Sequence, residues 1–265
     1  MNLARTGTLG GWMLTLKLIL APSLIAAVTL VGRRWGHKVG GLVTALPVVA
    51  GPTLGFYAIE QGNAFAAQAA HTALLGLVGV AGFCLVYARV CGTRSWPASL
   101  GTGTGVFVLA TALLHQAPVG LALSLLLTLA SLASAVVMLP AVHAVRPATN
   151  HSPWDLPLRM TAAATVVLTL TSMAAWLGPS WSGLLASFPV ATTIIASFTH
   201  AQHGARSTVW FFRGLLPGLA GFALFCFVLA TALGSLRMAL LPAATTALAT
   251  QVSLQSLMLW WIARR

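Results

Sequence analysis

The chain has 265 residues, of which 58% are hydrophobic and only 6% are charged. A soluble domain carries about a quarter charged residues, so this composition excludes a water-soluble fold and predicts a protein whose solvent is lipid. The formal net charge of +12 does not indicate nucleic-acid binding, because the basic residues stand singly or in twos and threes between apolar runs, as they do in the cytoplasmic loops of membrane proteins.

Apolar segments long enough to cross a bilayer recur along the whole chain, at about 20 residues per crossing. In chain order the sequence predicts nine of them, at residues 12–31, 39–59, 64–88, 96–114, 118–142, 156–176, 181–200, 207–232 and 238–262. The ninth is the least regular, since Gln251 and Gln255 interrupt it. We therefore expect an all-α, polytopic transmembrane helical bundle that forms a single membrane domain over residues 1–265.

Basic residues follow the odd-numbered segments. These residues are Arg33, Arg34, Lys38, Arg89, Arg94, Arg146, Arg206, Arg264 and Arg265. The opposite set of loops holds Glu60, His115 and Arg237, together with Arg5 before the first segment. The positive-inside rule then predicts a multi-pass protein of the cytoplasmic (inner) membrane, with its N-terminus outside and its C-terminus inside. The first segment is not expected to be a cleaved signal peptide, because its stronger basic cluster follows the apolar run.

The sequence repeats itself at an ungapped offset of 142 residues. Residues 36–88 match residues 178–230 at 16 of 53 positions, and the matches include Pro47 with Pro189 and Gly62 with Gly204. Chance would give roughly one match in ten in so biased a composition. We interpret residues 10–115 as repeat one, 118–143 as a linking helix and 155–265 as repeat two. Five crossings separate equivalent points, so the two four-helix repeats are expected to be inverted.

Inverted repeats are typical of secondary transporters, which rock around a site near the bilayer midplane. The sequence therefore predicts a transporter or flippase that works by alternating access. The alternative is a non-transporting membrane component that packs with a partner complex through its glycine-rich faces at 76–83 and 214–221.

Prolines at matching positions of the two repeats mark a candidate substrate site. Pro47 and Pro189 each remove a backbone donor inside an apolar helix, and irregular backbone in a membrane is tolerated only against protein or a wet cavity. Paired interrupted helices are typical of transport sites, although a structural kink explains the same pattern. The polar side chains that complete this candidate substrate-binding set are Thr44, Ser187, Thr192 and Thr193.

Basic residues also match between the repeats. Lys17 aligns with Arg159 and His71 with Arg213, each five to seven residues into its segment. Intramembrane charges are costly and are usually functional, and both acids of the chain fall near segment ends. Unpaired cations at these positions predict binding of an anionic small molecule or a lipid-linked anion. Snorkelling to the interface is the alternative for Lys17 and Arg159, and any proton coupling would fall to His71.

Enzymatic function is not expected. The sequence has no His-Glu-x-x-His motif, no paired acids and no Gly-x-Ser-x-Gly elbow, although a Ser–His pair on facing helices stays open. We expect neither a metal nor a cofactor, and the three cysteines show no ligand or disulfide spacing. The expected partners are membrane lipids, the anionic substrate and, as one option, a second copy of the chain in a homodimer.

The segment from Gly41 to Pro47 and its counterpart from Gly183 to Pro189 resemble the GlpM-like small membrane proteins. That family has a comparable run of small residues ending in Phe-Pro after its first span, and this chain looks like a duplicated, fused version of it. The first copy departs from the pattern with Leu46 in place of Phe and Thr44 in place of Ala. The resemblance covers about two windows of thirty residues and implies a membrane location, with little about the substrate.

Overall fold

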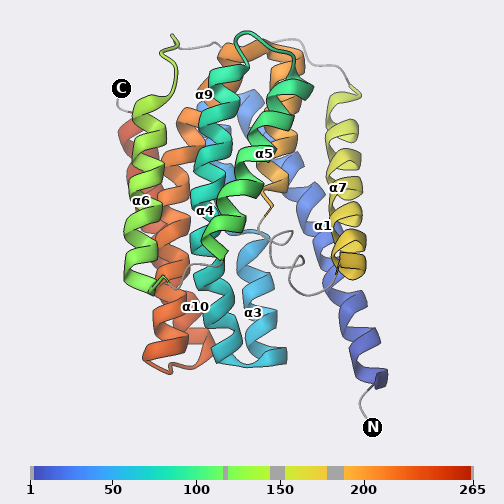
Figure 1. The fold of residues 1–265 in the computed structure, drawn as a ribbon, viewed down its shortest axis with the longest axis vertical. Helices are drawn as coiled ribbons and strands as arrows, with labels where there is room; N and C mark the ends of the chain where they lie inside the picture. Colours follow the sequence, from blue (N-terminus) through green and yellow to red (C-terminus); the bar gives the residue numbers. More distant parts are fainter. Residues whose placement is uncertain (1–2, 116–118, 144–152, 178–187, 264–265) are drawn as a thin grey trace.

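The computed structural model describes residues 3–115, 119–143, 153–177 and 188–263. All secondary structure in these ranges is helical, and the long helices run along one axis (Figure 1). The long helices are α1 (Leu3–Trp35), α4 (Asn63–Val90), α5 (Trp96–His115), α6 (Leu121–Met138), α7 (Asp155–Leu177), α9 (Val190–Ala230) and α10 (Leu240–Ala263). Shorter helices are α2 (His37–Thr44), α3 (Ala50–Gln61) and the π-helical turn η1 (Thr231–Ser235).

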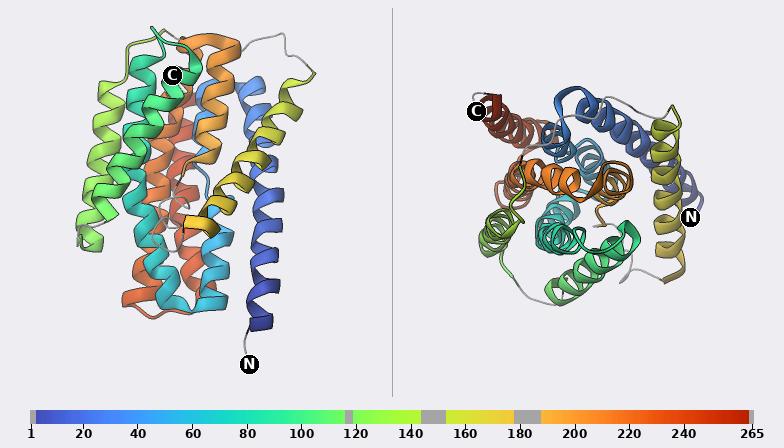
Figure 2. Two further views of the ribbon diagram at one scale, coloured as in Figure 1. Left: turned by 45° about the vertical axis from the view of Figure 1, so that its right-hand side comes forward. Right: turned by 90° about the horizontal axis from the view of Figure 1, so that it is seen from above.

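Several helices have the length and composition of membrane spans, which agrees with the prediction of an all-α membrane protein. Five qualify within the described residues: Leu18–Trp35, Asn63–Val90, Trp96–Leu114, Leu121–Met138 and Val190–Ser235. Seen from above, α4 and α9 lie in the interior, and α1, α5, α6, α7 and α10 surround them (Figure 2).

The segment predicted at 39–59 is broken in two. Helix α2 ends at Thr44 and α3 begins at Ala50, and Pro47 lies buried in the break between them. The break follows from the missing amide of proline, which cannot donate to a carbonyl one turn earlier. The matching segment is described only from Phe188 onward, where Pro189 stands at the N-cap of α9.

Glycines with positive φ set the other turns of the chain. Gly62 separates α3 from α4 with φ 91° and ψ 164°, and Gly204 bends α9 with φ 78° and ψ 176°. Residues with a Cβ rarely adopt this conformation, so glycine is needed at both places. The two glycines match at the offset of 142 residues, and their backbone conformations are alike.

Glycine-rich faces bring the interior helices into close contact. A Cβ on Gly41 of α2 would overlap the backbone of Phe211 in α9, and one on Gly214 would overlap the carbonyl of Lys38. Gly79 of α4 similarly faces Phe107 of α5. Both glycine-rich faces, at 76–83 and 214–221, therefore contribute to packing inside the chain, and the expectation that they are free for a partner complex is wrong.

Candidate functional site

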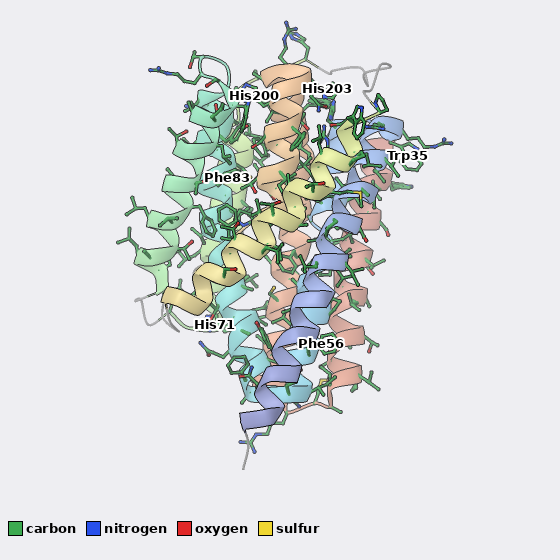
Figure 3. The ribbon with its side chains drawn as sticks, turned by 90° about the vertical axis from the view of Figure 1, so that its right-hand side faces the viewer. Trp35, Phe56, His71, Phe83, His200 and His203 are labelled. Carbon is green, nitrogen blue, oxygen red and sulfur yellow. The ribbon has the colours of Figure 1, made fainter. Side chains whose placement is uncertain are left out.

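A small polar cavity lies where α1, α2, α7 and α9 meet, and its free volume of 20 Å³ holds one or two water molecules. It is at the end of the bundle where α1 ends and α7 begins, which we call the basic end because Arg33, Arg34, Lys38, Arg89, Arg94 and Arg206 are at helix ends or turns there (Figure 1). Figure 3 places Trp35, His200 and His203 toward this end and His71 and Phe56 toward the other.

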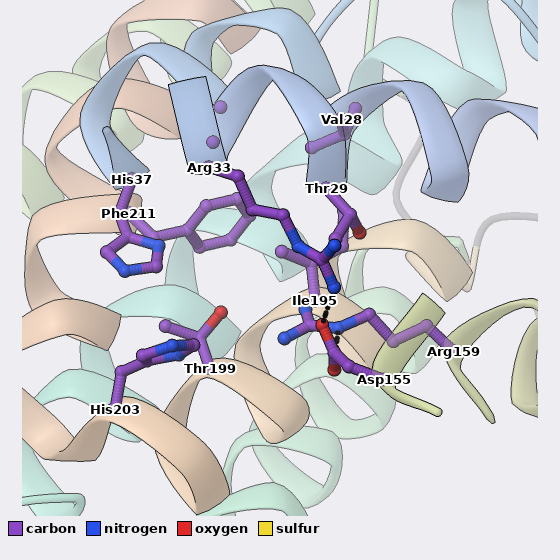
Figure 4. Close-up of a pocket in the computed structure, with 12 residues that line it drawn as sticks. Val28, Thr29, Arg33, His37, Asp155, Arg159, Ile195, Thr199, His203 and Phe211 are labelled. Carbon is purple, nitrogen blue, oxygen red and sulfur yellow. Dashed lines mark hydrogen bonds and ion pairs between the residues drawn. The ribbon is translucent and has the colours of Figure 1, made fainter. Parts of the chain in front are cut away.

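One carboxylate organises the cavity. Asp155, the first residue of α7, accepts a hydrogen bond from Arg33 Nη2 at 2.8 Å and one from Arg159 Nε at 2.7 Å (Figure 4). Gln202 of α9 donates to the same carboxylate at 2.6 Å and accepts from Arg159 Nη2 at 3.1 Å. The network ties together α1, α7 and α9.

The network is largely withdrawn from water. Asp155 and Arg159 are each only 3% exposed, and the Arg159 guanidinium also lies 5.1 Å from the ring centre of Phe198. Burial opposes ionisation of Asp155, but the hydrogen bonds from Arg159, Arg33 and Gln202 outweigh it and lower the pKa of this carboxyl to about 2. Two guanidiniums face one carboxylate, so the network carries one net positive charge.

Further polar groups complete the walls. His37 of α2 and His203 of α9 lie with ring centres 5.1 Å apart, and Thr29 and Thr199 line the same space (Figure 4). Thr29 is 7% exposed, and within the described residues its Oγ1 has no hydrogen-bond partner. Arg33 Nε is likewise buried and without a partner in this part of the chain.

Helix α10 carries a second buried polar feature, at the break between α2 and α3. Gln251 Nε2 donates to the carbonyl of Ala45 at 2.9 Å, and Gln255 Nε2 donates to that of Leu42 at 3.0 Å. Backbone groups freed by a break inside a membrane need such partners. These glutamines, which make the ninth segment irregular in sequence, therefore stabilise the interrupted helix.

Histidine and arginine at matching positions of the repeats contact the linking helix α6 at opposite ends. His71 Nε2 lies 2.8 Å from Ser124 Oγ, near the start of α6, and Arg213 Nη2 donates to the carbonyl of Pro140, just after its end, at 3.0 Å. Neither residue lines the cavity. These two positions therefore hold α6.

The Ser–His pair left open by the sequence is present, but its geometry is that of a structural contact. Ser124 Oγ also lies 3.0 Å from the carbonyl of Gly120, the usual partner of a helical serine. With the hydroxyl proton directed to this carbonyl, the His71 ring donates to Ser124 and cannot act as its base. No group of three or more metal-ligating side chains occurs within the described ranges.

Of the basic residues predicted to bind substrate, the structure brings only Arg159 to the cavity. The expectation that no carboxylate pairs with these cations is wrong for Arg159, because Asp155 at the start of its own helix reaches it at spacing i, i+4. Snorkelling is excluded for this residue by its burial. Lys17 lies in α1, but its side chain is outside the described part of the structure.

The proline and hydroxyl candidates lie away from the cavity. Pro47 and Pro189 stand at the helix break and the helix start described above. The hydroxyls of Thr44 and Thr193 bond carbonyls of their own segments, Gly40 at 2.8 Å and Val190 at 2.8 Å. Thr192 is buried, and Ser187 lies outside the described residues.

Sequence reasoning missed most of the cavity. Arg33 was interpreted only as a loop charge, and the neighbouring His37 and His203 as interfacial. The available signal was the scarcity of acid, because one of only two carboxylates in the chain stands four residues before Arg159. Comparison with protein-family models, curated proteins and solved structures gives no match.

Proposed function

We propose that this chain is a transporter or flippase of the cytoplasmic membrane, which moves a small or lipid-linked anion by alternating access between two inverted repeats. The observation that carries the proposal is the buried, net positive cluster of Arg33, Asp155 and Arg159. Arg33 belongs to the first repeat and the other two to the second, so the cluster joins the two halves. A buried cationic excess attracts an anion, and ionisable groups within membrane proteins mark substrate pathways.

The inverted arrangement is supported by pairs of features at equal offset. Gly62 and Gly204 share one backbone conformation, and the matched pair His71 and Arg213 contact opposite ends of α6. Residues related by a two-fold axis through the middle of α6 would meet that helix in this way. With the basic end in the cytoplasm, the cluster faces the cytoplasmic side.

The cluster also provides a contact that alternates with transport. While Arg33 bonds Asp155, α1 and α7 are held together at the basic end. An arriving anion competes for the guanidinium, which weakens the contact between the repeats and lets that end open. The break at Pro47 and the bend at Gly204 are the positions where such a movement changes backbone angles with least loss of packing.

Thiol accessibility in membrane vesicles tests the proposal. The three natural cysteines are buried, so the wild-type chain gives a low background with a membrane-impermeant maleimide. Thr199→Cys should be labelled in inside-out vesicles at a rate that changes when a transported anion is added, whereas exposed Arg94→Cys should be labelled at one rate throughout.

Flux provides the second measurement. Proteoliposomes containing the purified chain should take up radiolabelled phosphate, or a carboxylate, or translocate a fluorescent anionic lipid, and Arg159→Gln should abolish the movement. A Thr199→Cys labelling rate that ignores every anion, together with no flux of any of the three probes, contradicts the proposed function.

A further inference from the structure

We propose that the cavity holds the oxyanion group of the substrate, one carboxylate or phosphate group, between Arg33 Nε and Thr29 Oγ1. This inference rests on the proposed function and deepens it by assigning the residues that recognise the anion. The argument uses the unpaired donors, the charge and the size of the cavity.

Unpaired donors mark the position. Thr29 Oγ1 and Arg33 Nε are buried, without a hydrogen-bond partner among the described residues, and both residues line the cavity. Thr29 stands one turn before Arg33 in α1, so their side chains lie on one face of the helix. Leaving buried donors unpaired destabilises a protein, so such groups in a cavity indicate an absent partner that accepts hydrogen bonds.

Charge selects an anion for that partner. Asp155 neutralises only one of the two guanidiniums, and His37 and His203 on the facing walls add further donors. One monovalent oxyanion group would bring the Arg33, Asp155 and Arg159 cluster to neutrality. Arg33 can contact Asp155 with Nη2 and the ligand with Nε, because a guanidinium presents several donors in a fixed fork.

Size limits what the site holds. A free volume of 20 Å³ accommodates one or two oxygen-sized atoms, so only the head group of a larger anion enters the cavity. Thr199, which is 1% exposed, closes the wall on the α9 side. The same chemistry fits a free small anion and the phosphate of a lipid, and the experiment must separate these sources.

Ligand-dependent thermal stability of the purified chain in detergent is the test, because an anion that binds only the folded state raises the melting temperature by mass action. The probes are sodium formate, acetate and inorganic phosphate, each compared with sodium chloride at equal ionic strength. Nanodiscs of phosphatidylcholine with and without phosphatidic acid form the lipid arm. Stabilisation by free anions alone indicates a soluble substrate, and stabilisation by phosphatidic acid alone indicates a lipid-linked one.

Variants assign the effect to the cavity. Thr29→Val removes one hydroxyl at nearly constant volume and should weaken the apparent affinity about threefold to tenfold. Thr111→Val is the matched control, since Thr111 is equally buried but bonds its own helix at Phe107, away from the cavity. Asp155→Asn raises the net charge of the cluster by one, so it should bind the anion more tightly even if it melts at a lower temperature without ligand.

Equal stabilisation of the wild type, Thr29→Val and Asp155→Asn by the same anion overturns the assignment, as does the absence of any shift beyond that in chloride. The proposed function fails separately. Anion binding that depends on Thr29, in a chain with no flux, would leave this site and refute transport. Flux that is indifferent to Thr29→Val would leave transport and refute this site.

Discussion

Replacing Gly214 by alanine tests whether the contact between α2 and α9 fixes the architecture of the cavity. The added Cβ would overlap the carbonyl of Lys38, which is backbone and cannot rotate away. The two helices must therefore separate, and overpacking of this kind costs about 1 to 3 kcal/mol. Alanine also gains about 1 kcal/mol over glycine in a helix, so the net destabilisation should be about 0 to 2 kcal/mol.

Gly105→Ala in α5 isolates the propensity term, because a Cβ there meets no atom within 4 Å. We expect Gly105→Ala to unfold at the same or higher denaturant concentration than the wild type, and Gly214→Ala to unfold at a lower one than Gly105→Ala by about 1 to 3 kcal/mol. Reversible unfolding in mixed micelles with increasing SDS measures both. Equal shifts for the two variants would refute the close approach of α2 and α9.

The remaining predictions concern the polar groups. Gln251→Leu leaves the carbonyl of Ala45 without its donor and should cost about 1 to 3 kcal/mol in the same unfolding assay, whereas Ser256→Leu on the exposed face of α10 should cost almost nothing. Because the pKa of Asp155 is lowered to about 2, its contribution to stability should be full above about pH 4 and lost as the pH falls toward 2. Thermal melts from pH 2 to 6 should show this loss in the wild type and lack it in Asp155→Asn. Arg213→Gln removes the bond to the end of α6, so it should lower stability while leaving anion-induced thermal shifts unchanged; a lost shift would place Arg213 on the substrate pathway instead.

The sequence was sufficient for the helical membrane class and for the position of the main break. Composition and apolar periodicity depend on each segment alone, and Pro47 interrupts its helix through a local loss of a donor. The identity of Gly62 with Gly204 likewise reflects a local need for positive φ, which the structure confirms at both glycines.

The site was harder to predict because its members come from distant parts of the chain. Arg33 and Asp155 are 122 residues apart, and no local pattern relates them. Gln251 gives a different lesson, since its polarity argues against a membrane helix until its partner, a carbonyl 206 residues earlier, is known. His71 and Arg213 were correctly matched to each other, but their alignment does not reveal that both face α6.

The contacts of α6 determine which part of this helix a rocking motion would displace. It is held near its first turn through Ser124 and just past its last turn through Pro140, once by each repeat. Leu132, buried midway between these two anchors, would lie at the pivot. A spin label there should report the same environment in every state of a transport cycle, while labels beside the anchors should report displacements in opposite directions.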